Sequence, residues 1–427
     1  MFTIPSFKLP SLSLAKSRFP TIDFPAVEIH DVETAAEKRP RTLKHLLKAN
    51  HANYSIIYHE LRFHNHCSHI LGSAYILGAT HEHLNDIYDK EASELEPWRD
   101  APGEISKDDW RDFLGKREYQ RAFVDFFEDQ LVVKGYDWKS LLHEYLYEGD
   151  EPLINNMISG LGHSLIHLGY AYELNSRTVA IEALAIGSCF HNGLHKYLDD
   201  PSYTKPSPKQ SSSLLEILEQ VKNDKRFDGL YDHQNGDMSK IFEKQEGAFL
   251  EYWNAWDLSD PKEQFKESQK TATAVLMATP GATHADYDFF FVHLLTTSHA
   301  VRILLPLVPA KYHISLVRQW WLLTLAVYIS QTRPDIELGR IEKYDLKGQD
   351  WKFVVNKALA SPRSLDAHFV KALRAMKVAS ETWGDASQFY LKSAVKLADE
   401  FEDWGGFGPE DDVVLYHPGQ SSNQLNI

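Results

Sequence analysis

Apolar residues recur at intervals of three and four along most of this 427-residue chain, from Arg41 to Asp403. That spacing gathers them on one face of a helix, and no segment shows the sustained alternation of a half-buried strand. Helices are predicted over residues 41–50, 54–79, 117–134, 151–174, 177–198, 214–222, 238–256, 262–278, 287–307, 312–331, 351–359, 364–378 and 381–403. The pattern therefore predicts an all-α protein, a large bundle-like assembly of helices around a single core.

Proline and glycine mark the two ends of the helical region. Prolines at positions 5, 10, 20 and 25 interrupt residues 1–40, which predicts an extended N-terminal arm on the surface of the core. Residues 41–404 form the predicted helical domain, with a proline- and serine-rich linker at about 199–213 that is either a domain boundary or a loop. Residues 405–427 are predicted to be an irregular tail.

Charge and cysteine content limit the partners and the compartment. The chain has 45 basic and 60 acidic residues, a net charge of −15, which argues against binding to nucleic acid or to an anionic membrane. Cys67 and Cys189 are too few for a disulfide framework and favour a reducing compartment. Residues 1–10 lack the features of a signal peptide, and no apolar run is long enough to span a membrane. We expect a cytoplasmic protein, and the sequence leaves its oligomeric state open.

Histidines in apolar helical segments are the main chemical signal. The chain has 21 histidines, and three pairs lie in such segments: His66 and His69, His163 and His167, and His293 and His299. An imidazole in an apolar helix loses hydration unless its lone pair is bound, and a spacing of three or four residues puts two rings on one side of a helix. Helices carrying such pairs can build most of a metal coordination sphere. Structural, hydrogen-bonded histidines are the alternative.

The three pairs differ in detail. His66 lies at the border of the apolar face of its predicted helix and His69 on the far side, so His66, His69 or both could reach a metal. His163 and His167 form an HxxxH pair, as in zinc proteases, but the glutamate of HExxH is replaced by serine. The residues around His293 are apolar.

Hydroxyl groups and a second imidazole follow His293 in the same predicted helix. Thr297 lies one turn after His293 and His299 a little further on. Groups of this kind commonly fix the tautomer and orientation of a metal-binding imidazole. We therefore expect Thr297 or His299 to support His293. His191 and His195 form a further pair, near a helix end, for which a structural role is favoured.

Three ordered blocks carry a family resemblance: FHNHCSHILGSAYILGA at 63–79, GHSLIHLGYAYEL at 162–174 and FFFVHLLTTSHA at 289–300. They resemble the questin oxidase-like family of fungal polyketide biosynthesis, over about residues 45 to 400. The resemblance implies oxidative opening of a questin-type anthraquinone ring to a benzophenone. It is closest to iron-dependent dioxygenases in which several histidines and a carboxylated lysine bind one iron. It thus implies Fe(II) bound by residues among His66, His69, His163, His167 and His293, with a carbamate derived from carbon dioxide on Lys377.

The surroundings of Lys377 in the sequence are compatible with that role. Lys377 follows Met376 and lies one turn from Leu373. A lysine buried among apolar groups loses its charge more readily, and the neutral amine can capture carbon dioxide to form a carbamate. The ordinary alternative is a lysine whose stem packs on apolar groups while its amine reaches water. With the resemblance, we expect Lys377 to be a metal ligand and to take part in catalysis, supported by Thr297 and His299.

Three functional hypotheses follow. The first is a non-haem iron dioxygenase that uses O₂ to cleave a carbon–carbon bond of an anthraquinone in fungal secondary metabolism. Aromatic side chains would stack on this flat substrate, the candidates being Phe289, Phe290, Phe291, Trp320, Trp321 and Tyr328. The second is an NADPH-dependent monooxygenase of Baeyer–Villiger type on the same substrate, although the sequence has no dinucleotide fingerprint. The third is a non-catalytic helical carrier of a ligand or haem.

Overall fold

A computed structural model of the protein describes residues 24–280 and 286–408. The expected arm up to residue 23 and the tail after residue 408 lie outside the described residues. The α-helices are α1 Lys38–Asn53, α2 Cys67–Leu77, α3 His81–Glu94, α4 Gln120–Val133, α5 Trp138–Leu146, α6 His163–Glu173, α7 Arg177–Cys189, α8 Lys196–Asp199, α9 Leu214–Lys222, α10 Ser239–Lys244, α11 Glu246–Trp253, α12 Pro261–Ala278, α13 Phe289–Leu304, α14 His313–Ser330, α15 Gly339–Glu342, α16 Trp351–Ala360, α17 Ala367–Trp383 and α18 Phe389–Glu400. The all-α prediction is confirmed.

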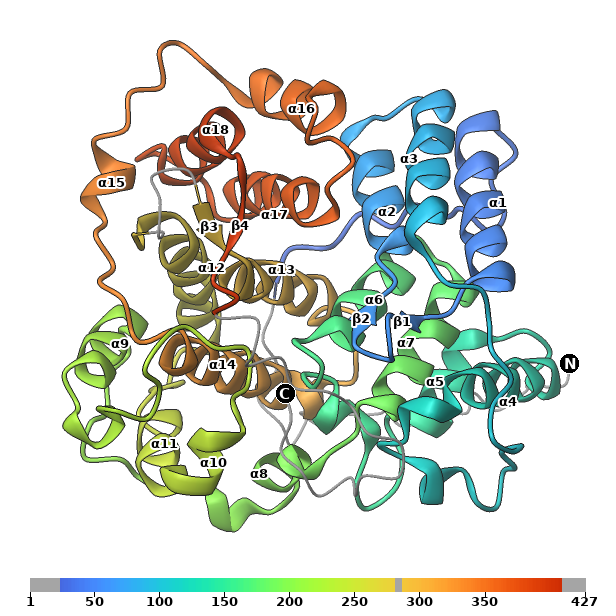
Figure 1. Ribbon diagram of the computed structural model, residues 1–427, viewed down its shortest axis with the longest axis horizontal. Coiled ribbons are helices and arrows are strands. Elements are labelled where there is room, and N and C mark those ends of the chain that lie inside the picture. Colours follow the sequence, from blue (N-terminus) through green and yellow to red (C-terminus); the bar gives the residue numbers. More distant parts are fainter. Residues whose placement is uncertain (1–23, 281–285, 409–427) are drawn as a thin grey trace, which may run out of the picture.

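The helices surround one continuous hydrophobic core. Helix α13 lies near the centre and packs against α6, α12, α14 and α17, while α6 also packs against α7 (Figure 1). The N-terminal helix α2 contacts the C-terminal helices α16 and α17, and α1 and α3 pack on α2 (Figure 1). Segments about 300 residues apart in the sequence therefore meet where α2, α6, α13 and α17 come together. None of the described helices is both long and apolar enough to cross a membrane.

Four very short strands and two isolated β-bridges are the β-structure among the described residues. Strand β1 (Ile57–Tyr58) pairs antiparallel with β2 (Phe63–His64), and β3 (Asp286–Asp288) pairs in parallel with β4 (Asp403–Gly405). Strand β2 leads into α2, and β3 runs directly into α13. Each small sheet therefore lies immediately before a helix that carries a histidine pair noted in the sequence.

The β1–β2 hairpin interrupts the helix predicted over residues 54–79. The turn between the strands has positive φ angles at His59, Glu60 and Leu61, which a helix cannot accommodate. Asn65 then fixes the exit from the hairpin: its side chain accepts from the Cys67 backbone N–H and donates to the Ser55 carbonyl. As a result α2 begins only at Cys67, and His66 occupies its N-cap position.

A second predicted helix, over residues 151–174, is also divided. A short 3₁₀ turn covers Leu153–Asn156, and α6 begins only at His163. Between them, Gly160 and Gly162 have φ angles of +63° and +74°, a conformation that glycine adopts without strain. His163 therefore stands at the first position of a helix and not in its middle.

A buried ionic group joins three helices of the N-terminal half. The ring of His51, on α1, binds Glu182 of α7 through Nδ1 at 3.0 Å and Glu128 of α4 through Nε2 at 3.1 Å. Burial disfavours the charged imidazole, but the hydrogen bonds to Glu128 and Glu182 outweigh it and raise the pKa of His51 to about 9. His51 is therefore an imidazolium at neutral pH.

This bridge predicts a pH dependence of stability. Because the pKa of His51 is higher in the folded chain than its ordinary value of 6.5, the stabilisation is complete below pH 6.5 and is lost as the pH rises through about 9. We expect the free energy of unfolding to fall by up to about 3 kcal/mol over this range, and His51→Gln to remove that dependence. Urea unfolding at a series of pH values measures it. The same pH dependence in both proteins would contradict the assignment.

Candidate metal centre

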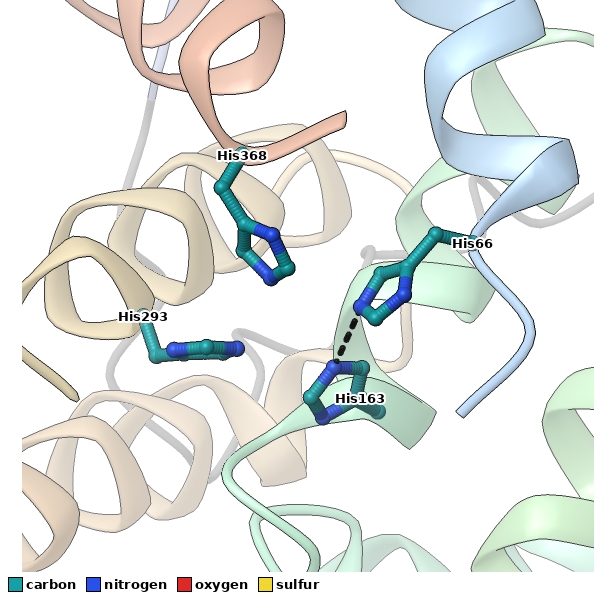
Figure 2. Close-up of side chains that lie close together, drawn as sticks. All are labelled: His66, His163, His293 and His368. Atoms are coloured by element: carbon teal, nitrogen blue, oxygen red, sulfur yellow. Dashed lines mark hydrogen bonds between the residues drawn. The ribbon is translucent and has the colours of Figure 1, made fainter. Parts of the chain in front are cut away.

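Four histidine side chains from four helices meet at one point (Figure 2). They are His66 at the N-cap of α2, His163 at the start of α6, His293 in α13 and His368 in the first turn of α17. One ring nitrogen of each lies within 4.8 Å of the corresponding nitrogens of the others. His163, His293 and His368 are buried, whereas His66 is partly exposed.

Close helix packing and helix caps hold these rings in place. Gly162, just before His163, lies so close to α13 that a Cβ there would be 2.6 Å from Oγ1 of Thr297. The carboxylate of Asp288 caps α13 by accepting from the Phe290 and Phe291 backbone N–H groups. Asp366 caps α17 in the same way, accepting from the N–H of His368 at 2.8 Å. The ends of α6, α13 and α17 are therefore fixed around the cluster.

Hydrogen bonds to the backbone set the tautomers of two rings. Nδ1 of His163 donates to the Gly160 carbonyl at 2.6 Å, and Nδ1 of His293 donates to the Phe289 carbonyl at 2.8 Å. A neutral imidazole has one N–H, so Nε2 of each ring carries a free lone pair. Nε2 of His163 lies 2.9 Å from Nε2 of His66, and Nε2 of His293 has no hydrogen-bond partner among the described residues.

Burial keeps these rings uncharged. It lowers the pKa of His66, His163 and His368 well below the ordinary value and that of His293 to about 3, and the nearby amine of Lys371 lowers them further. Several neutral imidazole nitrogens directed at one buried point are the donor set of a transition metal such as iron, zinc, copper or nickel. The residues present therefore fit a bound metal ion, and no carboxylate belongs to this cluster in the described part of the chain.

A buried lysine lies beside the cluster. Lys371 follows His368 by one turn of α17 and is 2% exposed. Burial lowers the pKa of Lys371 to about 7, although the charges of Asp366 and Glu91 oppose this shift. Nζ of Lys371 is 3.5 Å from Nδ1 of His69. A substantial fraction of this side chain is therefore a neutral amine at neutral pH, which is the nucleophilic form.

The structure does not bring Lys377 to the histidines. Lys377 lies nine residues after His368, which on a helix is about 180° around the axis and about 13 Å along it. Its amine pairs with Glu381 one turn later, and its side chain is 27% exposed. The lysine next to His368 is Lys371. Its neighbours Val370 and Ala372 are apolar, as are those of Lys377, so apolar surroundings alone did not distinguish the two lysines. The spacing of three between His368 and Lys371, on one helix face, was the available signal.

His69 and His167 form a second pair behind the cluster. Nε2 of His69 is 2.7 Å from Nδ1 of His167, and both rings are buried. Nε2 of His167 faces the carboxylate of Glu182, 3.9 Å from Oε2. Each of the two histidine pairs noted in the sequence is therefore split. His66 and His163 belong to the cluster, whereas His69 and His167 bind each other next to it.

Thr297 and His299 do not hydrogen-bond to His293. The hydroxyl of Thr297 points toward Gly162, and neither ring nitrogen of His299 has a partner among the described residues. His299 lines a small cavity of about 10 Å³ with Lys371 and Arg374. The Phe289 carbonyl, not a side chain, orients His293. His191 and His195 stay apart from the cluster, and His195 binds Asp199.

One of the aromatic candidates faces the cluster. The ring of Phe289 is 4.9 Å from that of His293 and 4.7 Å from that of His368. On its other sides it contacts Phe290, Trp404 and Phe407, of which Phe407 is 5.0 Å away and 53% exposed. Three candidates, Trp320, Trp321 and Tyr328, are fully buried core residues. Phe289 is thus the aromatic side chain best placed to contact a substrate.

Comparison with known proteins agrees with the blocks seen in the sequence. The profile of the questin oxidase-like family matches residues 63–376. The chain belongs to this family. The matched region includes all four clustered histidines and Lys371, and it ends one residue before Lys377. Membership makes the protein a questin oxidase-like oxidoreductase.

Named relatives cover most of the chain. A Baeyer–Villiger oxidase of Pestalotiopsis microspora is 28% identical over 81% of this chain and 83% of its own length. The Baeyer–Villiger oxidase mdpL of Emericella nidulans is 25% identical over 83% and 85%. The questin oxidase of Aspergillus terreus is 22% identical over 78% and 79%. The similarity therefore extends over most of the chain and not over one motif.

The cluster predicts which histidines bind metal. Replacing His163 or His293 by alanine removes a lone pair from the site, so we expect metal bound per chain to fall by about an order of magnitude or more. His191→Ala, outside the cluster, should bind metal like the unaltered protein. Elemental analysis after anaerobic Fe(II) loading and competition with a chelator measures this. Full retention of metal in both cluster variants would refute the site.

Proposed function

We propose that the protein is a non-haem iron dioxygenase that opens the ring of a questin-type anthraquinone. The observation that carries this proposal is the convergence of four neutral imidazoles, three of them buried, beside a buried amine in a chain of the questin oxidase-like family. The relative from Aspergillus terreus is named a questin oxidase, which supports an aromatic polyketide as the substrate class.

In this proposal His66, His163, His293 and His368 hold Fe(II), and Lys371 supplies the anionic ligand. The neutral amine of Lys371 combines with carbon dioxide to give a carbamate and a proton, and the carbamate takes the role first assigned to Lys377. One negative charge partly offsets the divalent ion, which four neutral rings cannot do. The iron would supply the binding and activation of O₂.

Phe289 and His66 suggest how an aromatic substrate approaches. His66 is the one ring of the four that is not fully buried, so the cluster is open on that side. The ring of Phe289 borders His293 and His368 and offers a flat apolar contact. A planar ring system lying on Phe289 would have its edge close to the metal. The backbone carbonyl that orients His293 belongs to the same residue, so substrate contact and metal geometry are linked there.

Two of the relatives are named Baeyer–Villiger oxidases, which favours a second candidate, an oxidation of Baeyer–Villiger type. For this candidate we take NADPH as the reductant. The two reactions differ in where the oxygen atoms go. Under ¹⁸O₂, with an anthraquinone substrate such as questin, we expect the iron-loaded protein to place both atoms of O₂ in the product without using NADPH. One labelled atom per product with one NADPH oxidised would establish the alternative. No product-coupled oxygen uptake would leave only a carrier function.

Lys371 and Lys377 provide a matched pair of variants. Lys371→Met cannot form the carbamate, so we expect its turnover to fall by about tenfold to a hundredfold even where histidines retain some iron. Lys371→Arg should fail equally, because a guanidinium stays protonated. Lys377→Met should keep turnover close to that of the unaltered protein. Steady-state oxygen uptake measures all three, and the reverse order of Lys371 and Lys377 would overturn the assignment.

A further inference from the structure

A line of buried polar side chains leads away from Lys371. Nζ of Lys371 meets Nδ1 of His69 at 3.5 Å, and Nε2 of His69 meets Nδ1 of His167 at 2.7 Å. Nε2 of His167 is 3.9 Å from Oε2 of Glu182, slightly longer than a hydrogen bond. Catalytic hydrogen bonds in proteins without their ligands are often long in this way. The four side chains come from α17, α2, α6 and α7, and each is at most 2% exposed.

The same line continues from Glu182 to the surface. The other oxygen of Glu182, Oε1, is 3.0 Å from Nδ1 of His51, and Nε2 of His51 is 3.1 Å from Glu128. The side chain of Glu128 is 45% exposed. Polar atoms therefore connect the buried amine of Lys371 with solvent, through five residues that are not part of the histidine cluster.

Glu182 gives this line a direction. An ionised carboxylate only accepts hydrogen bonds, so the charge of Glu182, 3.9 Å away, favours the tautomer of His167 that carries its proton on Nε2 and leaves Nδ1 bare. His69 then carries its proton on Nε2, and its bare Nδ1 accepts a hydrogen bond from Lys371. Nδ1 of His167 is also 3.1 Å from the His163 carbonyl, but a proton there would turn the lone pair of Nε2 toward the carboxylate. Every N–H of the line thus points from Lys371 toward Glu182.

We propose that Glu182, with His51 and Glu128, is the exit route for the proton that Lys371 releases when it becomes carboxylated. The inference rests on the proposed carbamate. The lone pair of the amine forms the C–N bond, one C–O π pair of carbon dioxide becomes a carboxylate lone pair, and an N–H proton leaves the nitrogen. That proton goes to Nδ1 of His69, the Nε2 proton of His69 goes to His167, and the Nε2 proton of His167 goes to Glu182.

The two rings change tautomer and keep their charge. Each gains a proton at Nδ1 and gives one from Nε2, so neither has to become an imidazolium in a buried site. As a proton arrives on Glu182, the His51 imidazolium releases its Nε2 proton to Glu128 and solvent, so the pair of Glu182 and His51 keeps its net charge of zero. His51 matches this task because it is bonded to both carboxylates at once. Glu182 is therefore a positioning residue for Lys371, acting through His167 and His69 and not through contact with the metal.

The test follows the rate at which Lys371 takes up labelled carbon. The full-length protein, loaded with diamagnetic Zn(II) and kept free of carbon dioxide, receives ¹³C-bicarbonate, and ¹³C NMR follows the carbamate signal with time. We expect Glu182→Gln, which cannot accept the proton, to slow loading by about tenfold or more while reaching a similar final occupancy. Glu182→Asp should restore part of the rate. A structural defect would instead lower the final occupancy and the amount of bound metal.

Glu91 provides the matched control. Its carboxylate belongs to α3, lies outside the line and raises the pKa of Lys371, so Glu91→Gln should load no more slowly than the unaltered protein. Should Glu182→Gln fold poorly, the double variant His51→Gln/Glu182→Gln leaves no unpaired buried charge and should show the same slow loading.

The outcomes separate this inference from the proposed function. A carbamate signal that appears equally fast in the unaltered protein and in Glu182→Gln, or that is slowed only by Glu91→Gln, would overturn the exit route and leave the carbamate standing. No carbamate signal in the unaltered protein, with Lys371→Met as the blank, would remove the carbamate and the route together.

Discussion

Four imidazole lone pairs directed at one buried point are the constraint on which the architecture around them depends. Neutral lone pairs repel one another at short range and burial limits the water that could separate them, so a bound cation would stabilise this arrangement. The arrangement requires α2, α6, α13 and α17 to pack so that the turns carrying these four histidines lie next to one another. Three kinds of local feature position these turns: the hairpin before α2, the glycines before α6 and the aspartate caps of α13 and α17.

Charge is arranged in layers around this point. The innermost groups are neutral rings, and the next is a lysine whose pKa burial has lowered to about 7. Ionised groups appear only further out, as the His51 bridge to Glu128 and Glu182 and as the buried pair of Arg374 with Glu173. Buried polar atoms without a hydrogen-bond partner among the described residues occur in His293 and His368 of the cluster and in His299 and Arg374 of the small cavity beside it. The amine of Lys371 is almost completely buried, so it must exchange protons through side chains. The side chains of His69 and His167 offer such a path.

Helical periodicity was enough to predict the fold class but not the two breaks that create the site. Residues 54–79 and 151–174 are apolar enough to be read as continuous helices, yet each contains a turn with positive φ angles. The turn at His59, Glu60 and Leu61 has no glycine, so its conformation depends on contacts that hold the hairpin, such as the Asn65 side chain. Those contacts join Asn65 to residues of α1, of α2 and of the segment before β1, and no local sequence pattern indicates them.

The sequence by itself determined that His66, His163 and His293 lie in apolar helical surroundings, because burial of a helix face is written in its periodicity. Only the tertiary structure decided which member of each pair turns toward the others, because a spacing of three or four brings two rings to one side of a helix without saying what lies opposite. The tertiary structure also decided that His368 and Lys371, and not Lys377, lie at the histidine cluster. All three share α17, and the face that meets α2 and α13 is chosen by the packing of helices far apart in the sequence.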